Sequence, residues 1–291
     1  MEQILGGLRR RIALTAELVA FQHTIFALPF ALMGMLLGAQ GRPGASQVLW
    51  IVAAMVGARS AAMSFNRIAD RRFDAANPRT AGRPLPSGRL GLTWAVVVLV
   101  ASCALLMGAA WMLNPLCFAL SPLALAIVLS YSYMKRFTWL THIMLGLSLA
   151  VAPVGAWIAV SAPLSAVPIL LAAAVLCWTA GFDIIYACQD VAFDRSHGLK
   201  SVPARFGVAT ALRLSSFLHV LMVLALAVMG RLAGLGAVFF AGLGVTSAFL
   251  VYEHRLVRPD DLSKVNIAFF TMNGWTSVVL CLAAALDLAF R

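Results

Sequence analysis

The chain of 291 residues is too apolar for a water-soluble globular protein, because 62% of its residues are hydrophobic and only 11% are charged. Its mean hydropathy of +0.92 is typical of an integral membrane protein. The formal net charge of +11 alone would suit a nucleic-acid-binding protein. The basic residues instead occupy the loops between apolar segments, so we expect no nucleic-acid partner.

Hydropathy predicts an all-α polytopic membrane protein. Nine apolar segments are each about long enough to cross ~30 Å of hydrocarbon. The connections between them are short, so we expect residues 1–291 to form a single transmembrane domain. The first segment is long enough to be a span rather than a cleavable signal. The nine segments are residues 18–39, 47–69, 92–112, 115–134, 141–160, 166–188, 210–229, 233–252 and 265–287.

Lysine and arginine are distributed unevenly between the two sides of the membrane. With a cytoplasmic N-terminus, the N-terminal segment and the loops after spans two, four, six and eight carry nearly all of them. Only Arg42, Arg231 and Arg291 fall on the other side. The positive-inside rule therefore predicts a cytoplasmic N-terminus and an outer C-terminus.

The second span ends in an acid-rich motif. Asn66, Asp70 and Asp74 follow one another at i, i+4 and i+8, on nearly one face of a helix. Carboxylates stacked at the end of an apolar helix repel one another, and an unpaired charge there is costly. A hard divalent ion such as Mg²⁺ suits these oxygen ligands. Alternatively, the arginines between residues 67 and 72 pair with the acids at a solvated helix end.

Residues 77–89 form the loop that follows this motif. Three prolines and two glycines exclude a regular helix here. A long loop rich in arginine suits a lid that closes over a polyphosphate through bidentate guanidinium contacts. A basic loop that only sets the membrane topology is the alternative.

A second acid-rich motif ends the sixth apolar segment. Asp183, Asp190 and Asp194 fall at i, i+7 and i+11, again on one narrow helical face, with Tyr186 beside it. A basic loop with glycine and proline, residues 195–207, comes next. Five of the eleven acidic residues lie in the two motifs, which we interpret as two halves of one metal–diphosphate site.

These motifs resemble those of the UbiA superfamily of intramembrane aromatic prenyltransferases, and the resemblance covers essentially the whole chain. The family pattern N-x-x-x-D-x-x-x-D is matched by Asn66, Asp70 and Asp74, and R-T-x-x-R-P-L-P-S-G by residues 79–88. The pattern D-x-x-Y-x-x-x-D-x-x-x-D is matched by Asp183, Tyr186, Asp190 and Asp194, and G-x-x-S-x-P-A-x-F-G by residues 198–207. Tyr133, Lys135 and Arg136 resemble the basic cluster after the fourth helix.

The resemblance implies nine transmembrane helices around a central cavity that opens to membrane lipid. It also implies Mg²⁺ as cofactor, a polyprenyl diphosphate donor and an aromatic acid acceptor. The expected metal ligands are Asn66, Asp70, Asp74, Asp183, Asp190 and Asp194. The expected diphosphate contacts are Arg79, Lys135, Arg136 and Lys200, with Arg83 as a further candidate; Tyr133 and Tyr186 are expected to contact substrate.

Within the superfamily, residues 23–29 and the string around Asn66 are similar to the 4-hydroxybenzoate polyprenyltransferase-like branch. That branch includes enzymes that prenylate 1,4-dihydroxy-6-naphthoate for menaquinone. The resemblance thus implies a bacterial inner-membrane enzyme of ubiquinone or menaquinone biosynthesis, with either aromatic acid as acceptor.

Arg59 is a charged residue in the middle of a span. It lies about ten residues from the cytoplasmic end of the second span, or roughly 15 Å deep. It stands seven residues before Asn66 and so shares its face. We expect this guanidinium to bind the carboxylate of the aromatic acid, with His23 of the first span as a second contact. The alternatives are a buried ion pair between Arg59 and Glu17, and hydrogen-bonded packing of His23.

Two other classes of protein also place acids inside membranes. A CDP-alcohol phosphotransferase-like lipid enzyme carries one glycine-containing acid cluster, whereas this chain has two clusters far apart. An ion-coupled secondary transporter uses buried acids for proton or sodium coupling. That class does not explain why both acid-rich helix ends lie beside arginine-rich loops on the same side.

Overall fold

The computed structural model describes residues 11–19 and 24–290, and these form helices and loops without a β-sheet. The predicted all-α class is confirmed. Eight of the described helical segments are long and apolar enough to cross a membrane. The long helices are α3 (Ala45–Ala69), α5 (Leu92–Leu113), α6 (Pro115–Phe137), α7 (Thr141–Ala159), α8 (Ala166–Ala187), α11 (Val208–Leu232), α12 (Ala237–Leu256) and α13 (Asn273–Ala289). The π-helix η3 (Ile267–Met272) leads directly into α13, and the two together form the last of these segments.

The first predicted span differs from expectation. Only part of this segment, residues 18–39, lies within the described residues: residues 11–18 are helical, and α2 (Thr24–Gly38) covers 15 residues. At 1.5 Å per residue α2 is about 22 Å long, which is shorter than the hydrocarbon core. Described residues thus contain eight full-length spans and one shorter apolar helix rather than nine equal spans.

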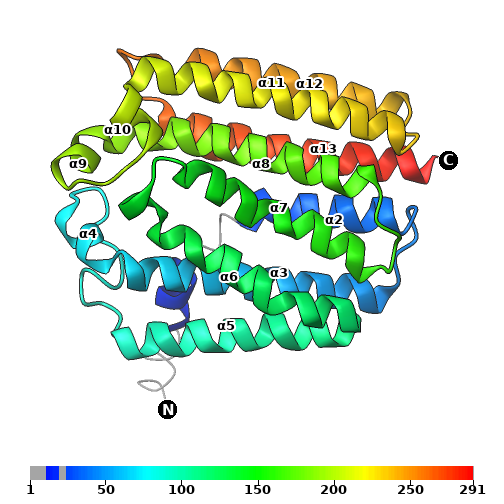
Figure 1. Cartoon of the computed structure of the whole chain (residues 1–291), viewed down its shortest axis with the longest axis horizontal. Coiled ribbons are helices and arrows are strands. Elements are labelled where there is room, and N and C mark those ends of the chain that lie inside the picture. Colours follow the sequence, from blue (N-terminus) through cyan, green and yellow to red (C-terminus); the bar gives the residue numbers. More distant parts are fainter. Residues whose placement is uncertain (1–10, 20–23, 291) are drawn as a thin grey trace.

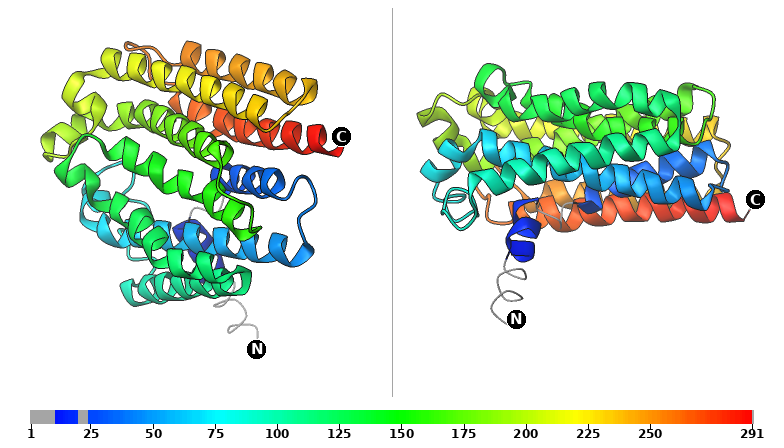
Figure 2. Two further views of the ribbon diagram at one scale, coloured as in Figure 1. Left: turned by 45° about the vertical axis from the view of Figure 1, so that its right-hand side comes forward. Right: turned by 90° about the horizontal axis from the view of Figure 1, so that it is seen from below.

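The long helices lie side by side with their axes roughly aligned (Figure 1). Helix α7 packs against α8, α2 and α6, while α3 packs against α5, and α11 packs against α8. The short helices α4 (Arg71–Ala76), α9 (Val191–Ser196) and α10 (Val202–Phe206) gather at one end of the bundle. The described C-terminus lies at the opposite end in both further views (Figure 2).

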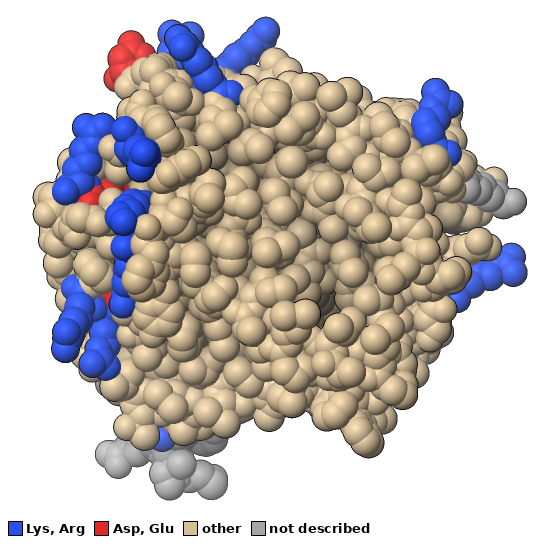
Figure 3. All heavy atoms as spheres, viewed as in Figure 1, with Lys and Arg blue, Asp and Glu red and all other residues tan. Residues whose placement is uncertain are grey.

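Charged side chains follow the same division. Figure 3 shows most visible lysine and arginine atoms at the end that carries α4, α9 and α10, with acidic atoms between them. A few basic side chains lie at the opposite end, and the surface between is uncharged on this face. This asymmetry agrees with the distribution of basic loops expected from the sequence.

The helix is interrupted at both acid-rich motifs, where the sequence predicts continuous helices. Helix α3 ends at Ala69, and Asp70, with φ −93° and ψ 5°, separates it from α4. Helix α8 similarly ends at Ala187, and a 3₁₀ turn (Cys188–Asp190) leads into α9. Each motif therefore begins on a long helix and ends on a short one that turns across the end of the bundle.

Aromatic packing and close helix contacts hold the bundle together behind these motifs. The fully buried Trp178 packs against Phe26, Phe30 and Phe182. On α3, a Cβ added at Gly57 would lie 2.7 Å from the backbone nitrogen of Leu106 in α5. Only a residue without a side chain permits this approach of two helices. The expected absence of helix across most of residues 77–89 is confirmed, since this segment consists of turns.

Candidate active site

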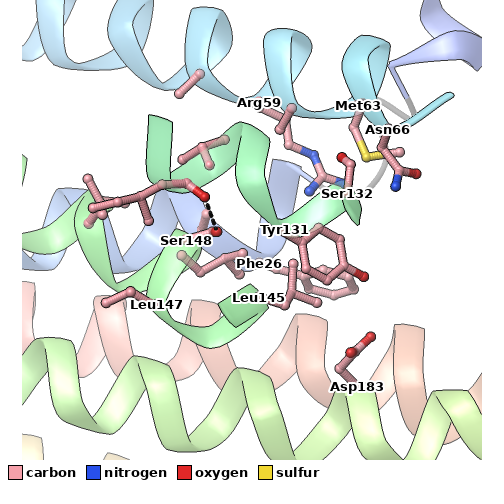
Figure 4. Close-up of a pocket in the computed structure, with 18 of the residues that line it drawn as sticks. Phe26, Arg59, Met63, Asn66, Tyr131, Ser132, Leu145, Leu147, Ser148 and Asp183 are labelled. Carbon is pink, nitrogen blue, oxygen red and sulfur yellow. Dashed lines mark hydrogen bonds between the residues drawn. The ribbon is translucent and has the colours of Figure 1, made fainter. Parts of the chain in front are cut away.

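A cavity of about 590 Å³ lies among α3, α5, α6, α7 and α8 and reaches the end of the bundle that carries the acid motifs. Its walls are apolar over most of its depth, with residues such as Met55, Leu106 and Val154. Its polar end is lined by both motifs and by the start of the 77–89 loop. Figure 4 shows Arg59, Asn66, Tyr131 and Asp183 reaching into it from three different helices. The predicted central cavity is thus present.

The first motif lies in a set of contacts with arginines. Asn66 Nδ2 donates to Asp70 Oδ2 at 3.0 Å, and Arg136 Nη2 donates to Asp70 Oδ1 at 3.1 Å. Arg83 Nη1 donates to Asp74 Oδ1 at 2.7 Å. Burial raises the pKa of Asp70, and the hydrogen bond from Arg136 opposes that rise. The other Asp74 oxygen, Oδ2, is buried without a hydrogen bond among the described residues.

The second motif contacts the 77–89 loop. Arg79 binds Asp190 at two points, Nε to Oδ1 at 3.1 Å and Nη2 to Oδ2 at 2.6 Å, and its Nη1 donates to the Tyr186 hydroxyl at 2.9 Å. Asn77 Nδ2 donates to Asp190 Oδ1 at 3.3 Å. Burial alone would lower the pKa of Arg79, but the hydrogen bonds and the charge of Asp190 outweigh it and raise that pKa. Arginine–carboxylate contacts therefore hold the loop at the polar end of the cavity, and the contact between Arg79 and Asp190 is bidentate. The contacts to polyphosphate expected of a lid stay a prediction.

The two remaining acids of the second motif, Asp183 and Asp194, accept hydrogen bonds from residues outside both motifs and outside the 77–89 loop. Asp194 is nearly inaccessible and accepts a hydrogen bond from Ser201 Oγ at 2.8 Å. Asp183 Oδ2 lies 2.6 Å from His142 Nδ1. All six predicted metal ligands nevertheless line the one cavity, at residues Asn66, Asp70, Asp74, Asp183, Asp190 and Asp194.

The predicted diphosphate contacts divide into two groups. Arg79, Arg83, Lys135 and Arg136 line the cavity. Lys200 is not among its lining residues, and its Nζ donates to the carbonyl oxygen of Phe137 at 3.0 Å. Of the two tyrosines, Tyr186 lines the cavity. Tyr133 does not, and its ring packs under the Arg136 guanidinium at 4.7 Å.

Arg59 lines the cavity together with Asn66, as their shared helical face predicts. Its Nε is buried and forms no hydrogen bond within the described part of the chain. The alternative pairing with Glu17 is wrong, because Glu17 binds Arg89 through contacts of 3.0 and 2.7 Å. His23 lies outside the described residues.

Several lining or supporting residues were not singled out from the sequence. Asn77 opens the arginine-rich loop, and Tyr131 stands one helical turn before Lys135 on the same face. His142 is a lone histidine near the start of an apolar helix, a position where polar side chains usually face the protein interior. Its distant partner, Asp183, gives no local signal in the sequence.

The donor chemistry of the polar end fits a hard divalent cation. Carboxylate and amide oxygens are the ligands that Mg²⁺ accepts, and Asp74 Oδ2 is a buried oxygen without a hydrogen bond among described residues. No three acidic, histidine or cysteine side chains of the described residues converge closely enough to form a ready-made metal cluster. The carboxylates instead pair with arginines from other segments, namely Arg79, Arg83 and Arg136. Of the arginines between residues 67 and 72, only Arg67 approaches an acid among the described residues, with its Nη1 4.0 Å from Asp74 Oδ2. Cation binding would therefore require the carboxylates to exchange arginine for metal.

Comparison with known proteins agrees with the geometry. The family model of the UbiA prenyltransferase family matches residues 27–276. The chain is similar to the 4-hydroxybenzoate octaprenyltransferase of Alkalilimnicola ehrlichii, with 30% identity and 99% of each chain covered. It is also similar to the protein of that name from Aeromonas hydrophila, with 34% identity over 86% of this chain and 87% of the relative.

Solved structures show the same fold. An apo UbiA homologue from Aeropyrum pernix K1 has a TM-score of 0.83 and 35% identity, covering 91% of this chain and 98% of that one. A UbiA homologue from Archaeoglobus fulgidus, bound to GPP and Mg²⁺, has a TM-score of 0.74 at 20% identity, covering 95% of this chain and 99% of that one. The eight spans of the described residues, the cavity lined by both acid-rich motifs and these matches lead to one conclusion: the chain belongs to the UbiA prenyltransferase family.

Proposed function

We propose that the chain, acting as one transmembrane domain, transfers a polyprenyl group from a polyprenyl diphosphate to the ring of a hydroxylated aromatic acid in the presence of Mg²⁺. The observation that carries this proposal is the division of one cavity into a charged end and a long apolar remainder. The charged end suits a diphosphate, and the apolar part suits its tail. The names of the relatives and the GPP and Mg²⁺ bound to the Archaeoglobus fulgidus homologue support it.

The charged end would bind and activate the diphosphate. Asn66 and the five aspartates of the two motifs would hold Mg²⁺, which supplies positive charge to a leaving group that gains negative charge. Arg79 and Arg83 would exchange their present carboxylate partners for phosphate oxygens, which have the matching two-point geometry. Lys135, which lines the cavity without an ion pair among described residues, would add a further donor. Lys200 and Tyr133 would support Lys135 and Arg136 from outside the lining.

The deeper part of the site would hold the aromatic acid. Arg59 provides a cation without a hydrogen-bonding partner among described residues, and a carboxylate is the anion that its planar fork fits. The rings of Phe26, Phe182 and Phe269 form one wall of the cavity. A low-water environment protects an allylic cation from hydrolysis until the electron-rich ring attacks it and loses a proton.

The acceptor class follows from the same groups. Both 4-hydroxybenzoate and 1,4-dihydroxy-6-naphthoate present a carboxylate for Arg59 and an activated ring. The relatives' names make 4-hydroxybenzoate the first acceptor to test. We propose that the reaction serves quinone biosynthesis at a bacterial inner membrane, with the lid loop on the cytoplasmic side.

The proposal is tested with protein reconstituted in lipid nanodiscs. It is incubated with Mg²⁺, prenyl diphosphates of graded length and each of the two acids, and both diphosphate release and the prenylated acid are measured. We expect product with at least one acid and none after chelation of Mg²⁺. Diphosphate release without a prenylated acid, or release that is independent of a divalent ion, would refute the proposal.

A further inference from the structure

We propose that His142 is a positioning residue, which fixes the carboxylate of Asp183 at the cavity and ties it to the segment Lys200–Val202. This inference rests on the proposed function, because Asp183 matters only where the acid motifs hold a cation. It adds a residue that belongs to neither motif.

The hydrogen bonds of His142 define its tautomer. The backbone N–H of Val202 donates to His142 Nε2 at 3.2 Å, so this nitrogen carries no proton. The ring hydrogen therefore resides on Nδ1, which donates to Asp183 Oδ2 at 2.6 Å. The backbone N–H of Val202 thus determines that His142 donates its ring hydrogen to Asp183.

The hydrogen bond between His142 and Asp183 is shielded from water because both residues are buried. His142 is 1% exposed and Asp183 is 8% exposed, so water does not compete for either ring nitrogen or for Oδ2. Asp183 Oδ1 has no hydrogen bond within the described residues, and Figure 4 shows this carboxylate directed toward Tyr131 at the cavity. His142 thus occupies one oxygen and leaves the other for a ligand.

The segment Lys200–Val202 connects His142 to the rest of the charged end. The Lys200 backbone N–H donates to the carbonyl oxygen of Lys135 at 2.7 Å. Ser201 Oγ donates to Asp194 Oδ2 at 2.8 Å. The three residues Lys200–Val202 therefore each contact a different part of the site. Lys200 contacts the end of α6, Ser201 contacts Asp194, and Val202 contacts Asp183 through His142. A change in the conformation of this segment would therefore alter the positions of all three groups.

The role of such a residue resembles that of histidine and carboxylate partners behind metal ligands, whose loss costs about 10- to 100-fold in metal affinity or activity. Glutamine at position 142 could replace both hydrogen bonds, because its side-chain amide donates from nitrogen and accepts at oxygen. Leucine has a similar size and can do neither. The pair His142→Gln and His142→Leu therefore separates hydrogen bonding from packing.

The experiment measures binding rather than turnover. Mn²⁺ replaces Mg²⁺ as an EPR-visible probe, and it is titrated into purified protein with a prenyl thiodiphosphate that resists cleavage. We expect His142→Leu to raise the Mn²⁺ dissociation constant about 10- to 100-fold, and His142→Gln to stay within about threefold of the unmodified protein. His219→Leu is the matched control, because His219 is also buried and uses both ring nitrogens but does not line the cavity. It should lower the unfolding temperature and leave Mn²⁺ binding unchanged.

The outcomes separate this inference from the proposed function. Unaltered Mn²⁺ binding in His142→Leu, or an equal loss in His142→Leu and His142→Gln, would overturn the role of His142. Absence of Mn²⁺ binding in the unmodified protein would instead refute the proposed function. Should His142→Leu not fold, Val202→Pro decides the question, with Val202→Ala as its control. Both variants replace the buried valine side chain, but only proline also removes the N–H that donates to His142. Proline is tolerated at this first residue of α10, after an extended residue. Binding by Val202→Pro equal to that of Val202→Ala would also overturn the inference.

Discussion

Replacing Arg59 by leucine should impair use of the aromatic acid far more than use of the prenyl diphosphate. The Nε of Arg59 is buried without a hydrogen bond among described residues, and the side chain lines the cavity beside Asn66. Figure 4 shows its guanidinium directed between Tyr131 and Ser132. Leucine removes the charge while keeping an apolar side chain on the same helical face.

The magnitude follows from the surroundings of the guanidinium. Removing one partner of a buried, hydrogen-bonded charge pair costs about 2 to 5 kcal/mol. The charged end of the cavity keeps some solvent access, since the side chains of Asp70 and Arg79 are 29% and 33% exposed, so we take the lower part of that range, about 2 to 3 kcal/mol. At 1.36 kcal/mol for each factor of ten, this predicts a loss of about 30- to 150-fold in kcat/KM for the acid.

The assay varies one substrate while the other is saturating, and repeats the series with a phenol that lacks the carboxylate. We expect the loss with the aromatic acid, and little difference between the two proteins with the phenol. Glu17→Gln serves as control and should leave the acid kinetics unchanged, because Glu17 binds Arg89 rather than Arg59. A loss of equal size with the phenol, or a loss confined to the prenyl diphosphate, would refute the reasoning.

Five further substitutions test other parts of the molecule. Asp190→Ala should lower turnover to less than about one hundredth without affecting membrane insertion; near-normal turnover across a range of Mg²⁺ concentrations would contradict the two-motif site. Arg79→Lys keeps the charge but loses the two-point contact of the guanidinium, so kcat/KM for prenyl diphosphate should fall about tenfold. An unchanged kcat/KM would show that the guanidinium does not bind the diphosphate at two points. Gly155→Leu should impair long prenyl diphosphates more than dimethylallyl diphosphate, because a Cβ at Gly155 meets no atom within 4 Å and the residue lines the cavity; equal effects on both lengths would place the tail elsewhere. Gly57→Ala should lower the free energy of unfolding in detergent by about 1 to 3 kcal/mol, because its Cβ would clash with the backbone of α5. Gly244→Ala is the control: its Cβ would meet no atom within 4 Å, so it should be neutral or stabilising by up to about 1 kcal/mol.

The sequence by itself determined the class of protein and the location of its charged end. Apolar segment length and hydropathy depend on neighbouring residues only, so the long helices were predictable from the chain. The spacing of Asn66, Asp70 and Asp74 is likewise local, and all three line one cavity, although Asp74 lies on α4 rather than on the helix that carries Asn66. Helical periodicity also placed Arg59 correctly beside Asn66.

Only the tertiary structure decided which groups are partners. Asp183 binds His142, 41 residues away, Arg89 binds Glu17 at a separation of 72, and Arg79 binds Asp190 at a separation of 111. The helix breaks at Asp70 and at Cys188–Asp190 were equally hidden, because α4 and α9 turn to fit the end of an assembled bundle. Periodicity states which face of a helix a residue occupies, whereas the partner on that face depends on how separate helices pack against one another.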